Sequence, residues 1–414
     1  MTRTIVIIGN GAAGNSAAET IRKNTRHGKV IMIAHEDCCA YSACALPDFL
    51  SGRLGRNEVF LKTPDDYSAN AITTLFGRRV TSINSQNHTV CLGDEDIKYD
   101  ELILATGSRA FLPPVPGAHL QGNFTVKSIF DVDAILEHHP QEVVVVGSGN
   151  IGVEISEALH MKGCKVTLVE QMNRILPRVL DEVPAQMVEK ILRRNGINIF
   201  TEETVLQVAG NGRVKSLSTN QRTITCDTVV WATGVKANVQ IADWAGVEIG
   251  SLGGIKVDSH MKTNLDHIYA CGDCTESINM ITGQPVLSQL WPTARQQGKL
   301  AALHLLGYPV KYEGSLNFVT EEIFGTNVVS IGLTSHDLKN QVQVIENHKH
   351  HAYARTLIAN GYVVGFQSIG LSSGWGAMTA LIKSRTPLSE LHRILADPFL
   401  YRKMSWYLPA REFF

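Results

Sequence analysis

Residues 4–14 read TIVIIGNGAAG, an apolar stretch of strand character that runs into a glycine turn. Gly9, Gly11 and Gly14 have the spacing G-x-G-x-x-G, and a helix is expected next, with Ala17 and Ile21 on one side. In a dinucleotide site the first glycine permits the tight turn, the second lets the backbone approach the pyrophosphate, and the third lets helix pack against strand. The stretch therefore predicts an α/β dinucleotide-binding fold, with the phosphates at the helix N-terminus.

The same pattern returns at residues 143–152, which read VVVVGSGNIG. Gly147, Gly149 and Gly152 repeat the spacing, and the next strand, residues 166–169, ends at Glu170, about where a ribose-binding carboxylate is expected. Two such folds in one chain imply two dinucleotides, since a dehydrogenase with a single cofactor needs only one. We assign FAD to one fold and a nicotinamide nucleotide to the other.

The acid of the first fold is displaced from the end of its strand. Residues 30–34 form the predicted second strand, and His35 precedes Glu36 and Asp37. We assign the ribose contact to Glu36, with Asp37 as the second choice. The alternative is that both are merely turn acids.

A cysteine-rich segment follows, with residues 38–47 reading CCAYSACALP. Cys44 is expected near the start of a helix that ends around residues 51–52, where a helix N-terminus can lower the pKa of a thiol. The alternative is a buried thiol that acts as a small hydrophobe. The adjacent Cys38 and Cys39 have the chemistry for a disulfide or half a metal site, but neighbouring loop cysteines more often form neither, and no metal site is predicted.

Two further strands end in the same tripeptide. Ala105-Thr106-Gly107 closes the first, and residues 232–234, ending in Gly234, close the second. Three prolines at positions 113, 114 and 116 mark a crossover between domains. The predicted domains are therefore an FAD-binding domain of residues 1–111 and 235–311, an NADH-binding domain of residues 112–234, a small α/β interface domain of residues 312–386 and a helical aromatic tail of residues 387–414.

The first domain resumes with a strand that ends at Gly272 and Asp273, whose carboxylate can accept a hydrogen bond from a ribityl hydroxyl. Cys271 and Cys274 have a dithiol spacing, but we favour the flavin motif over a redox pair. A helix begins at Trp291, and its backbone N–H groups are expected to face the pyrimidine edge of the flavin.

The composition limits the partners. The net charge of −1 gives no indication of a nucleic-acid partner, and no apolar run approaches the ~18 residues of a membrane span. The chain starts with a strand rather than a signal peptide, and its eight cysteines are scattered, which favours the cytoplasm. His348, His350 and His351 are attributed to a polar hairpin face rather than a metal. The tail aromatics, with Trp406 and Tyr407 as candidate anchors, suggest a contact surface, with packing on their own domain as the alternative.

Taken in order, these motifs resemble the FAD-dependent pyridine nucleotide–disulfide oxidoreductases over residues 1 to about 386. The resemblance implies an FAD domain, an inserted NADH domain and a C-terminal interface domain. It also places Glu154, in the NIGVEI stretch, at a position beside the nicotinamide. The residues expected to bind FAD are Gly9, Gly11, Ala13, Gly14, Glu36, Ala105, Thr106, Gly107, Gly272, Asp273 and Trp291. The residues expected to bind NAD(H) are Gly147, Gly149, Asn150, Ile151, Gly152, Glu170 and Gly234. The expected catalytic residues are Cys44 and Glu154.

The subfamily is less sharply marked. Residues 42–47 resemble the single-cysteine segment of coenzyme A-disulfide reductases and NADH oxidases, but residues 41–52 also align on rubredoxin reductases and nitrite reductases, which lack this cysteine. The aromatic segment that completes the thiol site in coenzyme A-disulfide reductases is not visible. The first expectation is electron transfer between NADH and a redox protein or iron–sulfur subunit, with the chain as a homodimer or in a hetero-oligomer. The alternatives are a disulfide reductase or oxidase using Cys44, and an NADH-sensing flavoprotein.

Overall fold

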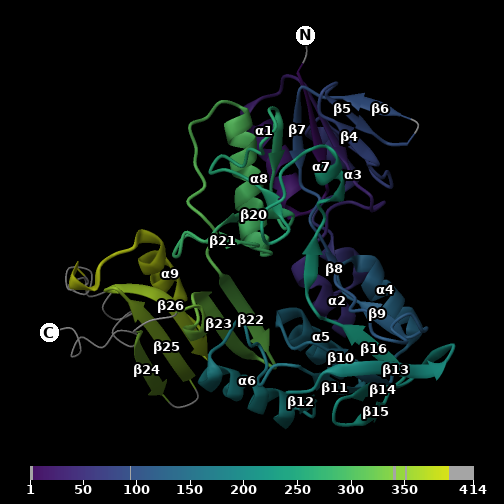
Figure 1. Ribbon diagram of the computed structural model, residues 1–414, viewed down its shortest axis with the longest axis vertical. Helices are drawn as coiled ribbons and strands as arrows, with labels where there is room; N and C mark the ends of the chain where they lie inside the picture. Colours follow the sequence, from purple (N-terminus) through teal and green to yellow (C-terminus); the bar gives the residue numbers. More distant parts are fainter. Residues whose placement is uncertain (1–2, 94, 339–341, 350–351, 391–414) are drawn as a thin grey trace. The chain divides into compact units, whose positions relative to one another are not determined.

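The chain folds as two compact units in a computed structural model that describes residues 3–93, 95–338, 342–349 and 352–390 (Figure 1). Unit 1 comprises residues 1–46, 54–109 and 235–316, and unit 2 comprises residues 47–53, 110–234 and 317–414. His350, His351 and the tail from residue 391 onward, with Trp406 and Tyr407, lie outside the described residues.

Unit 1 is built on a five-stranded parallel sheet in the order β19-β7-β1-β2-β3. Its strands are β1 (Thr4–Ile8), β2 (Lys29–Ile33), β3 (Ile72–Leu75), β7 (Glu101–Leu104) and β19 (Ile268–Ala270). All of β7 and all but the first residue of β1 are buried, as expected for a parallel sheet covered on both faces. Ile8 pairs with both Ile33 and Leu104, so the three central strands end at one level.

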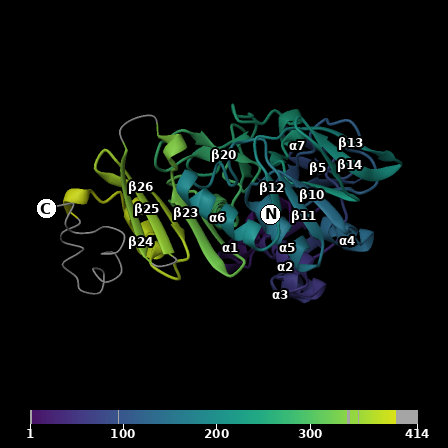
Figure 2. The same ribbon diagram turned by 90° about the horizontal axis from the view of Figure 1, so that it is seen from below.

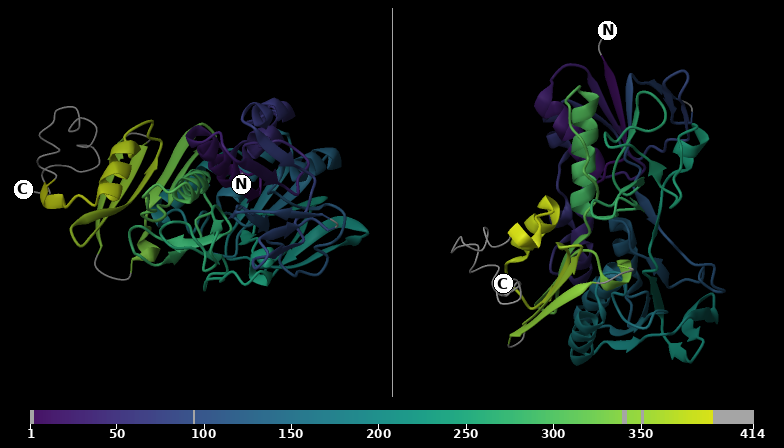
Figure 3. Two further views of the ribbon diagram at one scale, coloured as in Figure 1. Left: turned by 90° about the horizontal axis from the view of Figure 1, so that it is seen from above. Right: turned by 60° about the vertical axis from the view of Figure 1, so that its left-hand side comes forward.

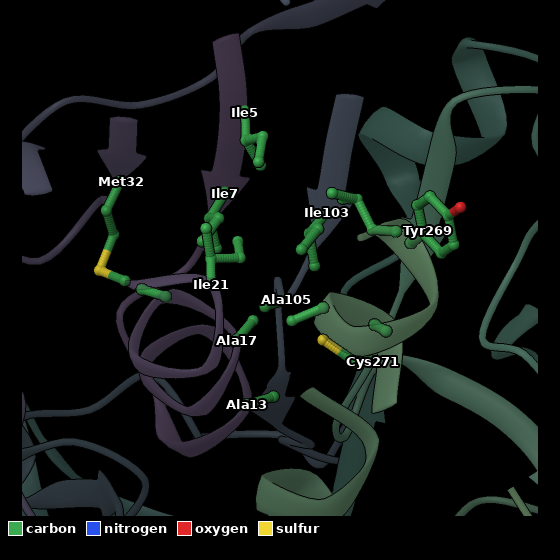
Figure 4. Packing of buried hydrophobic residues seen from close by; sticks show 14 of the residues in the cluster. Ile5, Ile7, Ala13, Ala17, Ile21, Met32, Ile103, Ala105, Tyr269 and Cys271 are labelled. Atoms are coloured by element: carbon green, nitrogen blue, oxygen red, sulfur yellow. The ribbon is translucent and has the colours of Figure 1, made fainter. Parts of the chain in front are cut away.

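The two faces of this sheet bury alternate residues of β1. Ile5 and Ile7 pack in one core with residues of α1 (Ala12–Asn24) and α8 (Trp291–Leu305), as Figure 4 shows for Ala13, Ala17 and Ile21 of α1. Val6 and Ile8 belong to a second core that includes Val90 and Val247. Helix α8 lies alongside α1, the long green and the purple helix of Figure 3.

The remaining elements of unit 1 are short. They are α3 (Pro64–Ala69), β4 (Ser82–Asn84), β5 (Thr89–Cys91), β6 (Asp96–Lys98), β17 (Val235–Ala237), α7 (Gln240–Trp244), β18 (Ile255–Lys256), β20 (Thr275–Ile278) and β21 (Pro285–Val286), with short 3-10 helices at Ala43–Ala45 and Arg56–Val59. Two elements span a unit boundary: β8 (Ser108–Ala110) and α2 (Leu46–Ser51).

Unit 2 repeats the sheet plan with the order β12-β11-β10-β16-β9. The strands are β9 (Asn123–Thr125), β10 (Glu142–Val146), β11 (Lys165–Val169), β12 (Asn198–Phe200) and β16 (Thr228–Trp231), and the helices are α4 (Ile129–His138), α5 (Asn150–Met161) and α6 (Glu182–Arg194). Val146 pairs with Val169 and Trp231, so β10 occupies the place that β1 has in unit 1. The antiparallel β13 (Val205–Asn211), β14 (Arg213–Thr219) and β15 (Thr223–Thr225) form a separate small sheet.

A third sheet of unit 2 is antiparallel, in the order β22-β23-β26-β25-β24. It consists of β22 (Phe318–Ile323), β23 (Thr326–Gly332), β24 (Gln343–Lys349), β25 (Ala352–Ala359) and β26 (Tyr362–Ile369). A short 3-10 turn at Ser335–Asp337 precedes β24, and α9 (Trp375–Ser384) and a second 3-10 turn at Leu388–Glu390 follow β26.

 Helix α6 packs against β22 and β26, and Figure 2 shows it beside the neighbouring β23. Asp181, just before α6, accepts hydrogen bonds from the backbone N–H and the hydroxyl of Ser335, and it forms an ion pair with Arg355 Nε at 2.9 Å. These contacts tie the antiparallel sheet to the segment that precedes α6.

The predicted α/β class with two Rossmann-like parallel sheets is confirmed. The finer division into FAD, NADH and interface domains stays a prediction, because unit 2 contains both of the last two segments. Within the described residues, no helix combines the length and the apolar character needed to cross a membrane.

Candidate functional site

In the glycine turn of unit 1, backbone atoms leave no room for a side chain at the first and third glycines, whereas the second glycine faces open space. A Cβ on Gly9 would lie 2.0 Å from the carbonyl oxygen of Ala105, and a Cβ on Gly14 would lie 2.0 Å from the carbonyl oxygen of Gly9. A Cβ on Gly11 would meet no atom within 4 Å. The first and third glycines are therefore required by the fold, whereas the second faces free space in which a ligand can approach the backbone.

The turn of unit 2 has the same geometry. A Cβ on Gly147 would lie 2.5 Å from the carbonyl oxygen of Ala232, and one on Gly152 would lie 1.9 Å from that of Gly147. A Cβ on Gly149 would again meet nothing within 4 Å. Each unit thus holds one cradle in which only a residue without a side chain leaves the backbone accessible.

The helices that follow these turns are suited to bind phosphate. Gly11 and Gly149 occupy the N-cap positions of α1 and α5, neither helix start is capped by a side chain, and neither first turn contains an acid. The free N–H groups and the helix dipole favour an anion there. In α5, the side-chain oxygen of Asn150 is buried without a hydrogen-bond partner among the described residues, and the neighbouring Ile151 is exposed.

Glu170 is held at the C-terminal end of β11 by three donors. One carboxylate oxygen accepts from the backbone N–H of Ser148 at 2.8 Å and from its hydroxyl at 2.7 Å, and the other accepts from the N–H of Met172 at 2.8 Å. The side chain is buried, and Ser148 belongs to the glycine turn itself. Arg174 donates to backbone carbonyls of Pro177 and Leu180 instead. The acid is thus fixed beside the phosphate cradle.

Glu36 of unit 1 has a looser environment. It is half-buried and accepts a hydrogen bond from the hydroxyl of Tyr41 at 2.9 Å, while the Cys38 thiol lies 3.9 Å from the same carboxylate oxygen. Asp37 is exposed, and its side chain lies against Gly77. Of the two acids considered from the sequence, Glu36 is therefore the one connected to the cysteine-rich segment.

A polar network behind the first glycine turn was missed by sequence reasoning. Tyr67 is buried, and its hydroxyl donates to Asn10 at 2.7 Å and Asn15 at 3.2 Å, and accepts from the N–H of Ala40 at 3.1 Å. The Asn10 amide donates to the carbonyl of Cys38 at 3.0 Å. Burial raises the pKa of Tyr67 to about 12, so the network keeps its proton and joins the turn to the cysteine-rich segment.

The glycine–aspartate motif lies between β19 and β20. Asp273 accepts a hydrogen bond from the Ser108 hydroxyl at 2.9 Å, and the N–H of Gly272 donates to the buried side chain of Gln297 at 2.8 Å. Cys271 and Cys274 are completely buried, and burial raises the pKa of both thiols. These features agree with the flavin motif rather than a redox dithiol.

Helix α8 connects this motif to α1. A Cβ on Gly298 of α8 would lie 2.1 Å from the carbonyl oxygen of Ala13, so the two helices cross at backbone contact. Trp291 is half-buried at the first position of α8, and the side-chain nitrogen of Gln289 just before it is buried with no partner among the described residues. An unpaired buried donor next to a helix N-terminus fits a ligand with acceptor atoms.

The tripeptides after β7 and β16 form sharp turns. Thr106 donates its hydroxyl to the carbonyl of Asn238 at 2.6 Å, and Gly107 accepts from the N–H of Asn238 at 2.9 Å. Gly234 has a φ of +98° and its carbonyl accepts from the N–H of Phe111 at 2.9 Å. Hydrogen bonds thus hold the first turn to the segment at Asn238 and the second turn to the segment at Phe111.

Cys44 is exposed in the 3-10 helix Ala43–Ala45, directly before α2, as the sequence predicts. Cys38 and Cys39 are half-buried, and none of the eight cysteines, which all lie among the described residues, forms a disulfide. Burial, with the charge of Glu36 second, raises the pKa of Cys38 to about 11, and burial also raises the pKa of Cys39. The vicinal pair is therefore protonated at neutral pH.

Glu154 lies in the second turn of α5, four residues after Asn150. Burial, followed by the charges of Asp48 and Glu157, raises the pKa of Glu154 to about 7. Glu157 is itself buried and pairs with Arg53 at 3.0 Å. A carboxyl group that titrates near neutral pH, one helical turn from a phosphate cradle, is suited to hold or release a proton.

Each set of predicted residues is collected within one unit. The FAD set and Cys44 belong to unit 1, and the NAD(H) set and Glu154 belong to unit 2. The open glycines, the uncapped helix starts and the unpaired atoms of Asn150 and Gln289 fit two dinucleotides. Among the described residues, no group of three or more histidines, cysteines and acids is arranged to hold a metal ion.

Comparison with known proteins agrees with this geometry. The model of the family described as pyridine nucleotide-disulphide oxidoreductase matches residues 3–298. An NADH oxidase of Methanocaldococcus jannaschii is 35% identical and aligns over 93% of this chain and 92% of its own. The epsilon subunit of an NADH-dependent phenylglyoxylate dehydrogenase of Aromatoleum evansii is 28% identical over 95% of this chain and 94% of its own.

Among solved structures, the NAD-dependent persulfide reductase of A. fulgidus superimposes with a TM-score of 0.88. It is 26% identical, and the match covers 94% of this chain and 78% of that chain. The same arrangement of elements is thus found in proteins whose names state different reactions.

Proposed function

Because the chain belongs to the pyridine nucleotide-disulphide oxidoreductase family and is an FAD-dependent NAD(P)H oxidoreductase, we propose that it transfers electrons between NADH and a redox-protein acceptor. The observation that carries this proposal is the presence of two separate glycine cradles, one in each unit. FAD, when bound, supplies a centre that accepts a hydride from NADH and passes single electrons on.

The residues of unit 1 would hold FAD. The N–H groups at the start of α1 would bind the pyrophosphate, Glu36 would accept from the adenosine ribose, and Asp273 would accept from the ribityl chain. Tyr41 would orient Glu36 through its hydrogen bond.

The residues of unit 2 would hold NADH. The start of α5 would bind the pyrophosphate, and Glu170 would accept from both ribose hydroxyls. A 2′-phosphate would face this buried carboxylate, and such a like-charge contact costs several kcal/mol. Since Arg174 is bonded to backbone carbonyls, no neutralisation of Glu170 by this side chain is expected. This supports NADH as the donor rather than NADPH.

A protein acceptor is supported by the end-to-end match with a subunit of a larger dehydrogenase. The names of the other relatives denote an oxidase and a persulfide reductase, so family membership alone leaves the acceptor open. We propose a ferredoxin, a rubredoxin or an iron–sulfur partner subunit as the acceptor, and a hetero-oligomer as the working form.

A second candidate is a disulfide or persulfide reductase that uses Cys44. The specific observation in its favour is that Cys44 is exposed in the 3-10 helix directly before α2. The hydride of NADH supplies two electrons and one proton, and with one more proton from solvent these convert a disulfide into two thiols.

The experiment that separates the two candidates is a set of NADH-dependent assays with Cys44→Ser and the matched control Cys91→Ser. With the proposed function, both variants reduce ferricyanide and an iron–sulfur protein at the wild-type rate. If instead the wild type turns over coenzyme A disulfide rapidly, reduces no iron–sulfur protein, and loses activity only in Cys44→Ser, the second candidate is correct.

A further inference from the structure

Three acidic side chains of unit 2 converge from a helix and a strand that are far apart in the sequence. Glu154 and Glu157 are three residues apart on α5 and therefore share a face of the helix. The turn after β22 docks on the same helix: the N–H of Phe324 donates to Glu157 at 3.2 Å, and the Phe324 and His160 rings are 5.8 Å apart. Glu321 lies on β22, three residues before Phe324, and the charge that acts on it most strongly is that of Glu154.

The cluster contains more acids than cations. Arg53 pairs with Glu157 at 3.0 Å and with Asp48 of α2 at 3.4 Å, so its charge is already shared. One carboxylate oxygen of Glu321 has no contact with solvent and no hydrogen-bond partner among the described residues. Ionisation of a carboxyl group without solvent or a hydrogen-bond partner is strongly unfavourable, so Glu321 is expected to hold a proton.

This environment raises the pKa values of both Glu154 and Glu321. Burial, with Asp48 and Glu157 next, raises the pKa of Glu154 to about 7. Burial, followed by the charges of Glu154 and Glu157, raises the pKa of Glu321 well above its ordinary value. Two interacting carboxyl groups of this kind titrate as a pair, and one proton is shared between them.

The other charges around the pair are few. His160 of α5 and the exposed Glu322 of β22 are nearby, the Lys162 ammonium lies close to Gly52, and β23, which pairs with β22, has no charged residue. Helix α6 also packs against β22, and its charged residues are Glu182, Glu189, Lys190, Arg193 and Arg194.

We propose that Glu154 and Glu321 hold one shared proton beside the dinucleotide cradle of unit 2, and that this proton leaves when NAD⁺ occupies the cradle but stays when NADH does. The inference rests on the proposed function, because it requires NAD(H) at the start of α5. Glu154 is four residues beyond Asn150, about 6 Å along the helix axis, so it lies about one helical turn from the cradle.

The physical reason is the charge difference between the two nucleotides. The nicotinamide ring of NAD⁺ is a cation and that of NADH is neutral, and a nearby cation favours the ionised form of a carboxyl pair. By linkage, NAD⁺ binding then releases a proton and becomes tighter as the pH rises, whereas NADH binding does not. Glu321 thereby acts as a positioning residue that sets which nucleotide the free site prefers at a given pH.

The test is calorimetric titration of the FAD-loaded protein with NAD⁺ and with NADH between pH 6 and 8, in buffers of different ionisation enthalpy. Wild type should release up to about three-quarters of a proton per NAD⁺ at pH 6.5, and its NAD⁺ affinity should rise about tenfold from pH 6 to 8, because a group whose pKa is about 7 loses most of its protonation within this range. NADH affinity should change less than about twofold.

Glu321→Gln should abolish most of the proton release at pH 7, because the neutral amide leaves Glu154 without the second carboxyl group that shares the proton. Glu322→Gln, on the exposed side of the same strand, should behave as wild type. Wild type that binds NAD⁺ without releasing a proton would overturn the inference and leave the proposed function intact, as would a Glu321→Gln variant that releases as much as wild type. Failure of both nucleotides to bind would contradict the proposed function, and the inference with it.

Discussion

The two dinucleotide folds share their glycine geometry and differ in how they hold their acids. In both, the first and third glycines are enclosed by backbone and the second is open. Glu170 of unit 2 is buried with three donors from its own fold, whereas Glu36 of unit 1 is half-buried and bonded to the hydroxyl of Tyr41. The turn is thus a property of the local sequence, while the contacts of the acid differ between the two folds.

The largest expected effect is a loss of stability where a new Cβ would overlap backbone atoms. Gly14→Ala and Gly152→Ala would place a Cβ about 2 Å from the carbonyl oxygens of Gly9 and Gly147. Overpacking of this kind costs about 3 kcal/mol, or about 10 °C in Tm, in the affected unit. Gly11→Ala and Gly149→Ala are the matched controls, since their Cβ atoms meet open space, and the apo-proteins should melt as wild type does. Equal destabilisation by all four changes would show that the cradles are not open.

The second largest expected effect is a change in the preference for NADH over NADPH, which distinguishes Glu170 from Glu36. Wild type should prefer NADH over NADPH on the order of a hundredfold in kcat/KM. Glu170→Gln should reduce this ratio to about tenfold or less, because the like-charge contact with a 2′-phosphate disappears. Glu36→Gln should leave the ratio unchanged. If Glu170→Gln keeps the wild-type ratio, discrimination resides elsewhere in unit 2.

A smaller effect, on the affinity for FAD, is expected from the hydrogen bond that Tyr41 donates to Glu36. Tyr41→Phe removes one hydrogen bond to a carboxylate that is half-exposed, worth about 1 kcal/mol. The Kd for FAD should therefore rise about fivefold in fluorescence titrations of the apo-protein. Phe60→Leu, which changes the ring that Tyr41 contacts but leaves the hydroxyl, is the control. An unchanged Kd in Tyr41→Phe would mean that Glu36 needs no such support.

The polar contacts around the glycine turns mark the limit of prediction from the sequence. The glycine turns, the tripeptides and the glycine–aspartate motif were predictable because each depends on neighbours in the chain. Tyr67 was not, because its contacts with Asn10 and Asn15 span more than fifty residues and follow from tertiary packing. The only signal was the presence of two asparagines in and just after the glycine motif.

Glu321 was missed for the same reason. It lies on a strand of the third sheet of unit 2, and the surrounding sequence, TEEIF, gives no sign that one of two adjacent glutamates has a carboxylate oxygen shielded from solvent. Alternation along β22 places Glu321 inward and Glu322 outward, but the register is fixed by the pairing with β23. Such a site becomes visible only when the fold brings the strand and the helix together.

The smallest effect is a pH dependence confined to unit 2. The raised pKa values of Glu154 and Glu321 stabilise the fold fully only below the unfolded value of about 4.3, and this stability is lost as the pH rises through the folded values. Glu321→Gln should therefore match wild type in Tm at pH 4.5 and exceed it by about 3 °C at pH 8. Glu322→Gln should follow wild type at both values. A larger gain at pH 4.5 than at pH 8 would reverse the sign of the account.

The central claim is that the two cradles serve different nucleotides, and anaerobic stopped-flow reduction of Gly149→Val tests it most directly. We expect this variant to be yellow, with wild-type flavin content, and to be reduced by dithionite but not by NADH. Gly11→Val should instead fold without flavin. A folded Gly149→Val protein that lacks flavin, or one that NADH reduces at the wild-type rate, would contradict the claim.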